Sequence, residues 1–305
     1  MKPSLGLFAP LVFVLFLTFT GFLARWTQPF EIFSHFRVHL AAAALALAIA
    51  LLAFGRVRAA ICALIAVAAN VAAIGWALAT PAPTAEAEAP FIRVLWVNLQ
   101  RKQDALDAAV ALARAERADI VAMTELPPER VDAVRRALPD FRCIVADSQS
   151  TSPSAVLIAS RRPCAASGPA PTTFRPAAAQ FADISGLRVV ALHARPPWSN
   201  ERTAQRNAVI AAGVRAASAH PRSLVVGDFN ATPWSPIVID AGRGRLRRAQ
   251  CGAPWAVTWG GNLPFYRLVI DHALVTSGLA VADCRLGPGI GSDHRPLLVD
   301  VVPSN

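Results

Sequence analysis

Three long uncharged segments dominate the first part of the chain. They cover residues 5–24, 40–55 and 59–80. A helix needs about 20 apolar residues to cross the hydrocarbon core of a bilayer, so the first and third segments are long enough. The middle segment is shorter and rich in alanine, and we assign it as a span because both of its neighbours are. The pattern predicts a membrane region at residues 1–80 with about three transmembrane helices.

The first uncharged segment also fits a secretory signal peptide, because Lys2 precedes it. However, its apolar stretch exceeds the roughly 7–15 residues of a signal core, and no small-residue cleavage site follows it. Arg25 and Trp26 follow instead. We therefore predict that the segment is retained, with cleavage as the alternative.

The Lys and Arg residues of the short loops predict the orientation of these helices, since cytoplasmic loops carry the excess of basic residues. Lys2, Arg56 and Arg58 lie on one side of the predicted spans, whereas Arg25 and Arg37 lie on the other. This excess of a single base puts the N-terminus in the cytoplasm and the domain that follows the helices outside it.

After the membrane region, the stretch "TPAPTAEAEAP" predicts a Pro/Ala/Glu linker at residues 81–90 that has nothing apolar enough to pack. The rest, residues 91–305, alternates short apolar strands with amphipathic helical stretches and predicts one α/β domain. Two βαβ-like halves with antiparallel strands between them indicate two sheets packed face to face, with helices outside. The expected strands are 91–98, 119–125, 141–147, 154–160, 179–185, 187–194, 223–230, 267–275, 281–286 and 296–302, and the expected helices are 102–117, 127–138 and 202–219.

The composition agrees with this division. Hydrophobic residues make up 54% of the chain and charged residues 16%, with a mean hydropathy of +0.41, whereas about a quarter of the residues of a soluble domain are charged. The formal net charge is +10, and most of it belongs to the domain after the linker. Such a surface attracts nucleic acid, nucleotides or phospholipid head groups. It is equally common beside an anionic membrane, so charge does not choose among these partners.

Cysteine usage bears on the compartment. Cys62 lies in a predicted span, which leaves Cys143, Cys164, Cys251 and Cys284 in the domain. An even set on several predicted strands permits disulfides in an oxidising compartment. Four buried free thiols are the alternative. The cysteines therefore favour an extracytoplasmic domain and leave the pairing open.

Polar side chains stand at the ends of the apolar strands. Any one of them is ordinary turn chemistry, and Asp228 and Asn230, two residues apart, are expected to face the same side of one strand. Acid, amide and imidazole groups at six strand ends together predict a site, because strand ends of a layered sheet converge on one rim. These residues are Asn98, Glu125, His193, Asp228, Asn230, Asp271, Asp293 and His294.

The motifs that contain these residues carry a resemblance. In chain order they are "WVN", "VAMTE", "ALHARPP", "VVGDFNATPWS", "VIDHALV" and "GSDHRPLLVDV". From about residue 91 to the end, the chain resembles the endonuclease/exonuclease/phosphatase superfamily, and the spans ahead of it resemble a bacterial membrane-anchored subgroup. The resemblance implies a four-layer α/β/β/α sandwich of the deoxyribonuclease I type. It also implies metal-assisted hydrolysis of phosphodiester or phosphomonoester bonds, at a bacterial inner membrane.

The resemblance further implies a metal site and a catalytic histidine. Glu125 would bind Mg²⁺ or Mn²⁺, with Asn98 and Asp293 as further ligands or water-mediated partners. Oxygen donors of this kind suit a hard cation. His294 would be the catalytic histidine, oriented by a hydrogen bond from its ring to Asp271.

Three more residues take roles around the phosphate in this comparison. Asp228 would position the attacking water, Asn230 would hold a phosphate oxygen, and His193 would stabilise phosphoryl charge or assist the leaving group. The chain departs from the family after His193, where Arg195 and two prolines follow. One helical turn apart, Arg202 and Arg206 are candidates for phosphate recognition or residues of a solvated helix face.

The leading hypothesis is thus a membrane-anchored, metal-dependent phosphoesterase with a nuclease-like substrate. A nucleotide or a phospholipid head group is the alternative substrate. A domain that binds phosphorylated ligands with little catalysis is the alternative function, although binding alone does not need an Asp–His pair. The implied partners are the phosphoester substrate and the lipid bilayer, and the sequence implies no protein partner.

Overall fold

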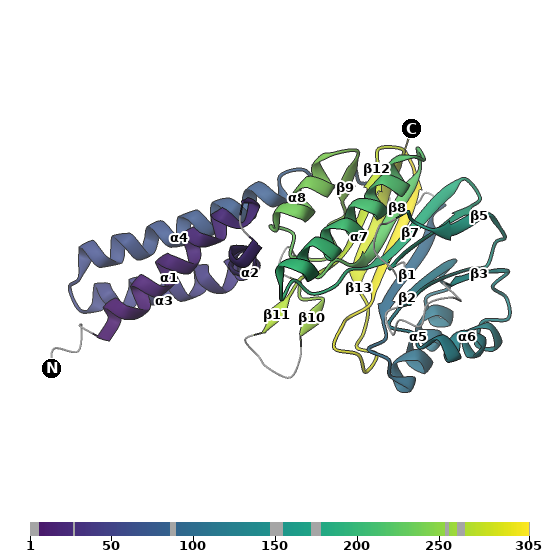
Figure 1. Ribbon diagram of the computed structural model, residues 1–305, viewed down its shortest axis with the longest axis horizontal. Helices are drawn as coiled ribbons and strands as arrows, with labels where there is room; N and C mark the ends of the chain where they lie inside the picture. The colour runs from purple at the N-terminus through teal and green to yellow at the C-terminus, as the bar shows by residue number, and fades with distance from the viewer. Residues whose placement is uncertain are drawn as a thin grey trace.

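The protein consists of a helical region that projects from one end of an α/β sandwich, as the computed structural model shows (Figure 1). The structure describes residues 6–26, 28–85, 90–146, 155–171, 178–253, 256–260 and 266–304, without the side chains of residues 28 and 29. The terminal residue Lys2, used in the predicted orientation, lies outside these ranges.

The first sheet of the sandwich has six strands in the order β13-β14-β1-β2-β4-β3. β1 and β2 are parallel, and the other neighbours are antiparallel. The strands are β1 (Ile92–Asn98), β2 (Ile120–Thr124), β3 (Cys143–Ala146), β4 (Val156–Ser160), β13 (Leu279–Leu286) and β14 (Leu297–Pro303).

The second sheet also has six strands, in the order β5-β6-β7-β8-β12-β9. Here β7 and β8 form the parallel pair. The strands are β5 (Cys164–Pro169), β6 (Ala179–Ile184), β7 (Leu187–His193), β8 (Ser223–Asp228), β9 (Leu246–Arg248) and β12 (Asp271–Thr276). A small additional pair is formed by β10 (Trp259–Gly260) and β11 (Arg267–Leu268).

Three apolar interfaces make four layers. Side chains from both sheets, including Trp96 and Val226, interdigitate in the central core. The helices α5 (Gln103–Ala115) and α6 (Val131–Ala137), the latter entered through the turn η3 (Pro128–Arg130), cover the first sheet. α7 (Asn200–Ser218) and α8 (Pro236–Arg243) cover the second. The predicted four-layer α/β/β/α sandwich is confirmed.

Several elements differ from the sequence prediction. The single strand expected at 267–275 is two strands, and β12 begins only at Asp271. The short elements β5, β9 and α8 were not predicted. β5 is a mostly exposed edge strand with small residues, and β9 has only three residues, two of them arginine, so neither shows an apolar pattern.

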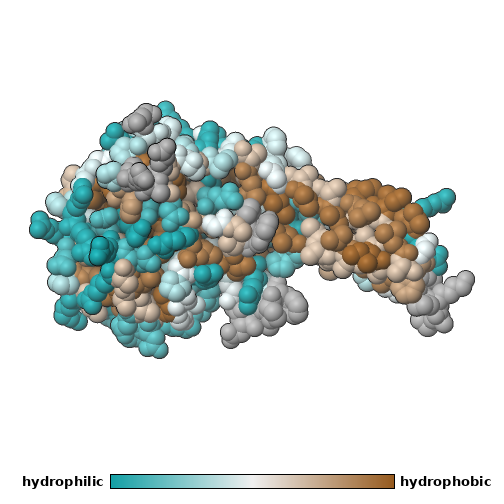
Figure 2. Space-filling model, turned by 180° about the vertical axis from the view of Figure 1, so that it is seen from behind, coloured by the Kyte–Doolittle hydropathy of each residue, from teal (hydrophilic) through white to brown (hydrophobic). Residues whose placement is uncertain are grey.

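The helical region contains α1 (Phe8–Thr20) with the 3₁₀ turn η2 (Gly21–Arg25), α2 (Gln28–His35), α3 (Arg37–Ala53) and α4 (Val57–Leu78). Two stretches of span length are present among the described residues, Phe8–Arg25 and Val57–Leu78, while α3 is apolar but has 17 residues. Figure 2 shows the apolar surface that these helices present beyond the hydrophilic sandwich. The sequence missed α2, which is a short amphipathic helix.

The predicted linker is partly packed. Ala82 donates its backbone N–H to the Arg248 carbonyl, and Ala85 donates to the carbonyl of Val281. Ala82 is buried against the central core. The expectation that nothing in this stretch packs was therefore wrong for residues 81–85, because paired backbone groups and one methyl group suffice; residues 86–89 lie outside the described residues.

Two disulfides join the sheets at both of their open edges. Cys143 of β3 pairs with Cys164 of β5, and these strands are edge strands of different sheets. At the opposite edge, Cys251, which follows β9, pairs with Cys284 of β13. Closing loops of 21 and 33 residues stabilises the fold by about 3–4 kcal/mol each through the unfolded chain. The four cysteines of the domain therefore form two disulfides and are not four buried free thiols.

Candidate active site

The polar strand ends meet at one rim because of the strand directions. β1 and β2 end at this rim, as do β7 and β8 in the other sheet. β12 runs antiparallel to β8 with Asp271 opposite Asp228, so its first residue reaches the rim. His294 precedes β14, which is antiparallel to β1. The expectation that Asp271 ends a strand was wrong, and the antiparallel direction of β12 explains why it still arrives at the site.

The Gly-Asp-Phe-Asn segment, which begins at the end of β8, positions the side chains of Asp228 and Asn230. A Cβ atom at Gly227 would overlap the carbonyl oxygen of Leu192 in the neighbouring strand, so this position requires glycine. Asn230 has a left-handed backbone with φ 46° and donates its N–H to Asp228 Oδ1 at 2.8 Å. Asp228 and Asn230 therefore come together through an Asx-type turn and not, as expected, as alternate positions of one strand.

Asp271 holds the ring of His294. Its Oδ2 lies 2.8 Å from His294 Nδ1, and its Oδ1 accepts a hydrogen bond of 2.9 Å from the indole of Trp96. The backbone N–H of Asp271 donates to Thr258 Oγ1 at 3.0 Å. All of these contacts are buried. The acid thus fixes the ring orientation and leaves His294 Nε2 directed towards Asp228 Oδ2, 3.6 Å away.

Asp228 is the centre of the remaining contacts. His193 Nε2 lies 3.7 Å from Asp228 Oδ2 and 3.6 Å from Glu125 Oε1. Asn98 Nδ2 donates to Glu125 Oε1 at 3.2 Å and to Asp228 Oδ2 at 3.4 Å. Asn230 Nδ2 donates to Asp228 Oδ2 at 3.2 Å. Glu125 has a φ of 52°, uncommon for such a residue and typical of functional sites.

Burial and neighbouring charges shift the pKa values of Asp228 and His294. Desolvation raises the pKa of Asp228 to about 8, with the charge of Asp271 adding to the shift and His294 opposing it. For His294, desolvation lowers the pKa, but the carboxylates of Asp271 and Asp228 outweigh it and raise the pKa to about 10. Each charge favours the other, so the ionisations of Asp228 and His294 are coupled.

Asp293 is anchored beside this cluster. Its Oδ2 accepts a 2.9 Å hydrogen bond from the indole of Trp259, and its N–H donates to Gln100 Oε1 at 3.2 Å. It lines the same cavity as Glu125. The structure thus brings eight of the nine predicted site residues together.

Arg206 is the exception, and its predicted contact with substrate was wrong. Its side chain is 0% exposed, and its Nη2 donates to both carboxylate oxygens of Glu31 at 2.6 Å. Glu31 also accepts from Ser235 Oγ at 2.7 Å. Arg206 lies on the face of α7 that receives α2, so it joins the helical region to the sandwich. One turn earlier, Arg202 does line the cavity.

The site opens into a cavity of about 530 Å³. Catalytic candidates form one side, and basic residues form part of the rim. Apolar and aromatic side chains form the rest, and three of the lining residues come from or directly follow α2. The lining residues used below are Ile32, His35, Phe36, Arg101, Arg195, Arg202, Trp198, Trp259 and Tyr266.

Sequence reasoning missed the supporting residues. Trp96 and Thr258, which hold Asp271, lie in a strand interior and in a loop. The available signal was Trp96 itself, two residues before Asn98, since a buried indole N–H usually has a hydrogen-bond acceptor. Nothing in the sequence indicated that Ile32 and Phe36, some 60 residues before the domain, line the cavity.

The donor set fits a hard divalent cation. Glu125 and Asp293 offer carboxylate oxygens at the cavity wall. Asn98, whose Nδ2 donates to Glu125, offers an amide oxygen beside them. The Glu125 side chain is 21% exposed, and Arg101 lies 3.8 Å from its Oε2. A second cluster, Asp228, Asp271 and His294, has ligand atoms within 4.8 Å of one another. There, however, both oxygens of Asp271 are already engaged by Trp96 and His294, so this cluster fits a cation less well.

Solved structures share this fold. The endonuclease/exonuclease/phosphatase from Bacteroides vulgatus has 18% identity and a TM-score of 0.57, with 71% of this chain and 100% of that chain covered. The 3′ phosphatase NExo from Neisseria, bound to a product DNA hairpin, has 17% identity and a TM-score of 0.56, with 68% and 98% covered. The human Nocturnin catalytic domain with bound sulfate has 18% identity and a TM-score of 0.55, with 70% and 94% covered.

A comparison with curated protein sequences gave no match. The profile of the Endonuclease/Exonuclease/phosphatase family matches residues 95–294. This range is well over half of the chain and runs from β1 to His294. The chain belongs to the Endonuclease/Exonuclease/phosphatase family.

Proposed function

We propose that the protein is a membrane-anchored, metal-dependent phosphoesterase. Phosphoester hydrolysis is the common activity of the family to which the chain belongs. The observation that carries the proposal is a buried series of hydrogen bonds from Trp96 to Asp271 and from Asp271 to His294. His294 Nε2, on the other side of the ring, lies 3.6 Å from Asp228 Oδ2. A ligand-binding domain has no need for an acid-oriented histidine, so this arrangement supports catalysis over binding alone.

Glu125, Asn98 and Asp293 would hold Mg²⁺ or Mn²⁺. When bound, the cation supplies charge neutralisation at the phosphoryl oxygens and at the leaving oxygen. Arg101, beside Glu125, adds positive charge to the same wall of the cavity.

The attacking water would lie beside this pair, within hydrogen-bond distance of both Asp228 and His294. Their facing atoms are 3.6 Å apart, which is too long for a good direct hydrogen bond and leaves both available to a shared water. Asp228 would orient the water, and His294 would exchange its proton with the reacting oxygens. His193 Nε2, close to both Glu125 and Asp228, would donate to a phosphoryl oxygen, and Asn230 would hold another through its amide group.

A nuclease-like substrate is the first candidate. The Neisseria relative was solved with a product DNA hairpin, and Arg101, Arg195 and Arg202 give the cavity rim a positive charge that suits a polyanion. Trp198 is 70% exposed and could stack on a base.

A phosphoester carried by a membrane lipid is the second candidate, and one observation favours it. Ile32 and Phe36, which lie between two apolar helices, form part of the cavity wall. Phe36 also contacts the ring of Tyr266, with 5.7 Å between the ring centroids. The helical region therefore contributes apolar surface directly to the site, where an acyl or prenyl chain would lie next to its phosphate.

The full chain in detergent, assayed on three substrates, tests the proposal and separates the candidates. Bis(p-nitrophenyl) phosphate, a DNA oligonucleotide and a head-group-labelled phospholipid are each incubated with Mg²⁺, Mn²⁺ or a chelator. We expect the chelator to lower turnover by about 10²-fold or more. Turnover that survives the chelator contradicts metal dependence. Whichever of the DNA and the phospholipid is hydrolysed faster identifies the substrate class. If none of the three substrates is hydrolysed, the proposed phosphoesterase activity is wrong.

We further propose that the sandwich lies outside the cytoplasm. The two span-length helices support anchoring, and the two disulfides support an oxidising compartment. Cells quenched in acid, then denatured and alkylated without reductant, should yield a chain labelled at Cys62 alone, as measured by the mass of the intact protein. Labelling of all five cysteines in the membrane-inserted chain would place the domain in the cytoplasm.

A further inference from the structure

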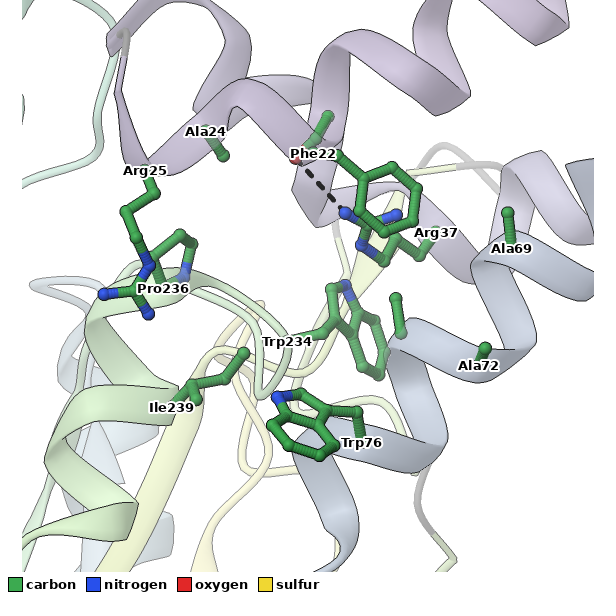
Figure 3. A pocket seen from close by; sticks show the side chains of 12 residues that line it. Phe22, Ala24, Arg25, Arg37, Ala69, Ala72, Trp76, Trp234, Pro236 and Ile239 are labelled. Atoms are coloured by element: carbon green, nitrogen blue, oxygen red, sulfur yellow. Dashed lines mark hydrogen bonds between the residues drawn. The ribbon is translucent and has the colours of Figure 1, made fainter.

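A second cavity lies away from the catalytic cluster, where the helical region meets the sandwich. Its volume is about 620 Å³, within the roughly 300–1,000 Å³ typical of small-molecule sites. Figure 3 shows Ala69 and Ala72 of α4 on one side and Pro236 and Ile239 of the sandwich on the other, with the indole rings of Trp76 and Trp234 between them. The walls are almost entirely apolar.

One charged side chain in this cavity lacks a counter-charge. Arg37 is 4% exposed, and its guanidinium lies 4.1 Å from the centroid of the Phe22 ring. Nη1 donates to Asn70 Oδ1 at 3.3 Å. Nη2 donates to the Gly21 carbonyl at 3.2 Å (Figure 3), and both hydrogen bonds are long.

The residues that the structure describes leave Arg37 unsatisfied in two respects. Its Nε has no hydrogen-bond partner, and no described carboxylate lies within ion-pair distance. The other base at the cavity, Arg25, is already paired with Asp240 at 2.8 Å. A buried, unpaired guanidinium is costly by several kcal/mol, so the cavity favours a ligand that brings a negative charge.

Aromatic side chains place this cavity at the level of lipid head groups. Trp26 and Trp76 are 75% and 62% exposed, and both lie at the end of the helices nearest the sandwich. Exposed tryptophans collect at the boundary between hydrocarbon and water. Arg243 lies 3.9 Å from the centroid of the Trp76 ring, on the sandwich side. Within the cavity, Arg37 lies on the helical side, level with Asn70 of α4, and the indoles of Trp76 and Trp234 lie towards the sandwich (Figure 3).

We propose that this cavity binds one anionic phospholipid. Its phosphate would pair with Arg37, and its acyl chains would run from Ala69 along α4, away from the sandwich. The glycerol part of the lipid would lie beside Ala72, against the indoles of Trp76 and Trp234. The inference rests on the proposed membrane anchoring and not on the proposed catalysis. The bound lipid would join α3 and α4 to the sandwich beside α2, and so support the helix that forms part of the active-site wall.

The test uses the full chain in detergent, stripped of lipid and titrated with phosphatidylglycerol or phosphatidylcholine, with adducts counted by native mass spectrometry. We expect a one-to-one adduct with phosphatidylglycerol that forms about tenfold more tightly than with phosphatidylcholine. Arg37→Gln should remove this preference. The matched control is Arg58→Gln, an exposed arginine at the start of α4, which should leave it unchanged.

Ala72→Phe provides a second variant that keeps the charge and fills the cavity, and it should lower binding of both lipids. It decides the matter if Arg37→Gln does not fold. Equal binding of the two lipids by the parent, a preference for phosphatidylglycerol that survives Arg37→Gln, or unchanged lipid binding by Ala72→Phe overturns the inference. Sedimentation of the chain with carbonate-washed membranes tests anchoring separately. A chain that sediments but binds no lipid contradicts the lipid site alone, whereas a chain that does not sediment contradicts the anchoring.

Discussion

Replacement of His294 by alanine is expected to lower kcat on bis(p-nitrophenyl) phosphate by about 10²–10⁴-fold, the usual contribution of a positioned general acid or base. His294 is 6% exposed, Asp271 fixes its ring through Nδ1, and Nε2 is the atom that faces Asp228. The substitution removes proton transfer and leaves Glu125, Asn98 and Asp293 in place. We therefore expect the loss in kcat to exceed any change in KM, as measured by steady-state kinetics in the presence of Mg²⁺.

Two variants give this experiment its controls. Asp271→Asn retains the shape of the orienting side chain but removes its charge, and it should lower kcat in the same direction. His220→Ala changes another histidine, in the turn between α7 and β8, at the end of the sheet opposite the site; its kcat should match that of the parent. If His294→Ala keeps more than about a tenth of the parent activity, the proposed role of this histidine is wrong.

Arg206→Met is expected to give the largest loss of stability of any single change at the junction. Glu31, whose side chain is 4% exposed, would keep Ser235 as its one side-chain hydrogen-bond partner among the residues that the structure describes. Breaking a buried ion pair by removing one partner costs about 3–5 kcal/mol, because the other charge remains buried. We expect the thermal midpoint of the full chain in detergent to fall by on the order of 10 °C.

Comparison with the double variant shows whether the ion pair is responsible. Glu31→Gln combined with Arg206→Met leaves no buried charge and should recover part of the loss. Arg215→Met changes an exposed arginine on the same helix, and its midpoint should stay near that of the parent. Equal midpoints for Arg206→Met and Arg215→Met would show that the junction does not depend on this pair.

The contacts of α2 connect the junction with the active site. Glu31 is bound to Arg206, and the indole of Trp234 donates to the His35 carbonyl at 3.3 Å. These anchors lie within a few residues of Ile32 and Phe36, which line the catalytic cavity. Loss of the ion pair should therefore change the cavity wall while the Asp271–His294 pair remains intact.

Much of the sandwich could be predicted from the sequence because its strands are locally distinct. β1, β2, β8 and β14 are apolar runs bounded by turn residues or acids, and their burial in a four-layer fold explains the lack of alternation. α5 has an apolar face at helical spacing. β5, β9 and α2 could not be predicted, since each is short and stable only through its neighbours.

Arg206 shows the limit of reading a helix face from sequence. Arg202 and Arg206 are one turn apart on α7 and carry the same charge, yet one lines the catalytic cavity and the other is buried against Glu31. The choice depends on where α2 packs on α7, which is a contact between segments about 175 residues apart. No local pattern contains that information.

The sequence by itself determined which side chains are candidates for the chemistry, because a strand that ends in an acid, amide or imidazole leaves a polar group at a sheet edge whatever the fold. It also determined the separation of an apolar helical region from a basic α/β domain. Only the tertiary structure decided that β12 runs antiparallel to β8 and so brings Asp271 to His294. It also decided that the disulfides join the sheets at both edges and that α2 lines the catalytic cavity. These depend on strand direction and on packing between distant segments, which the order of residues along the chain does not record.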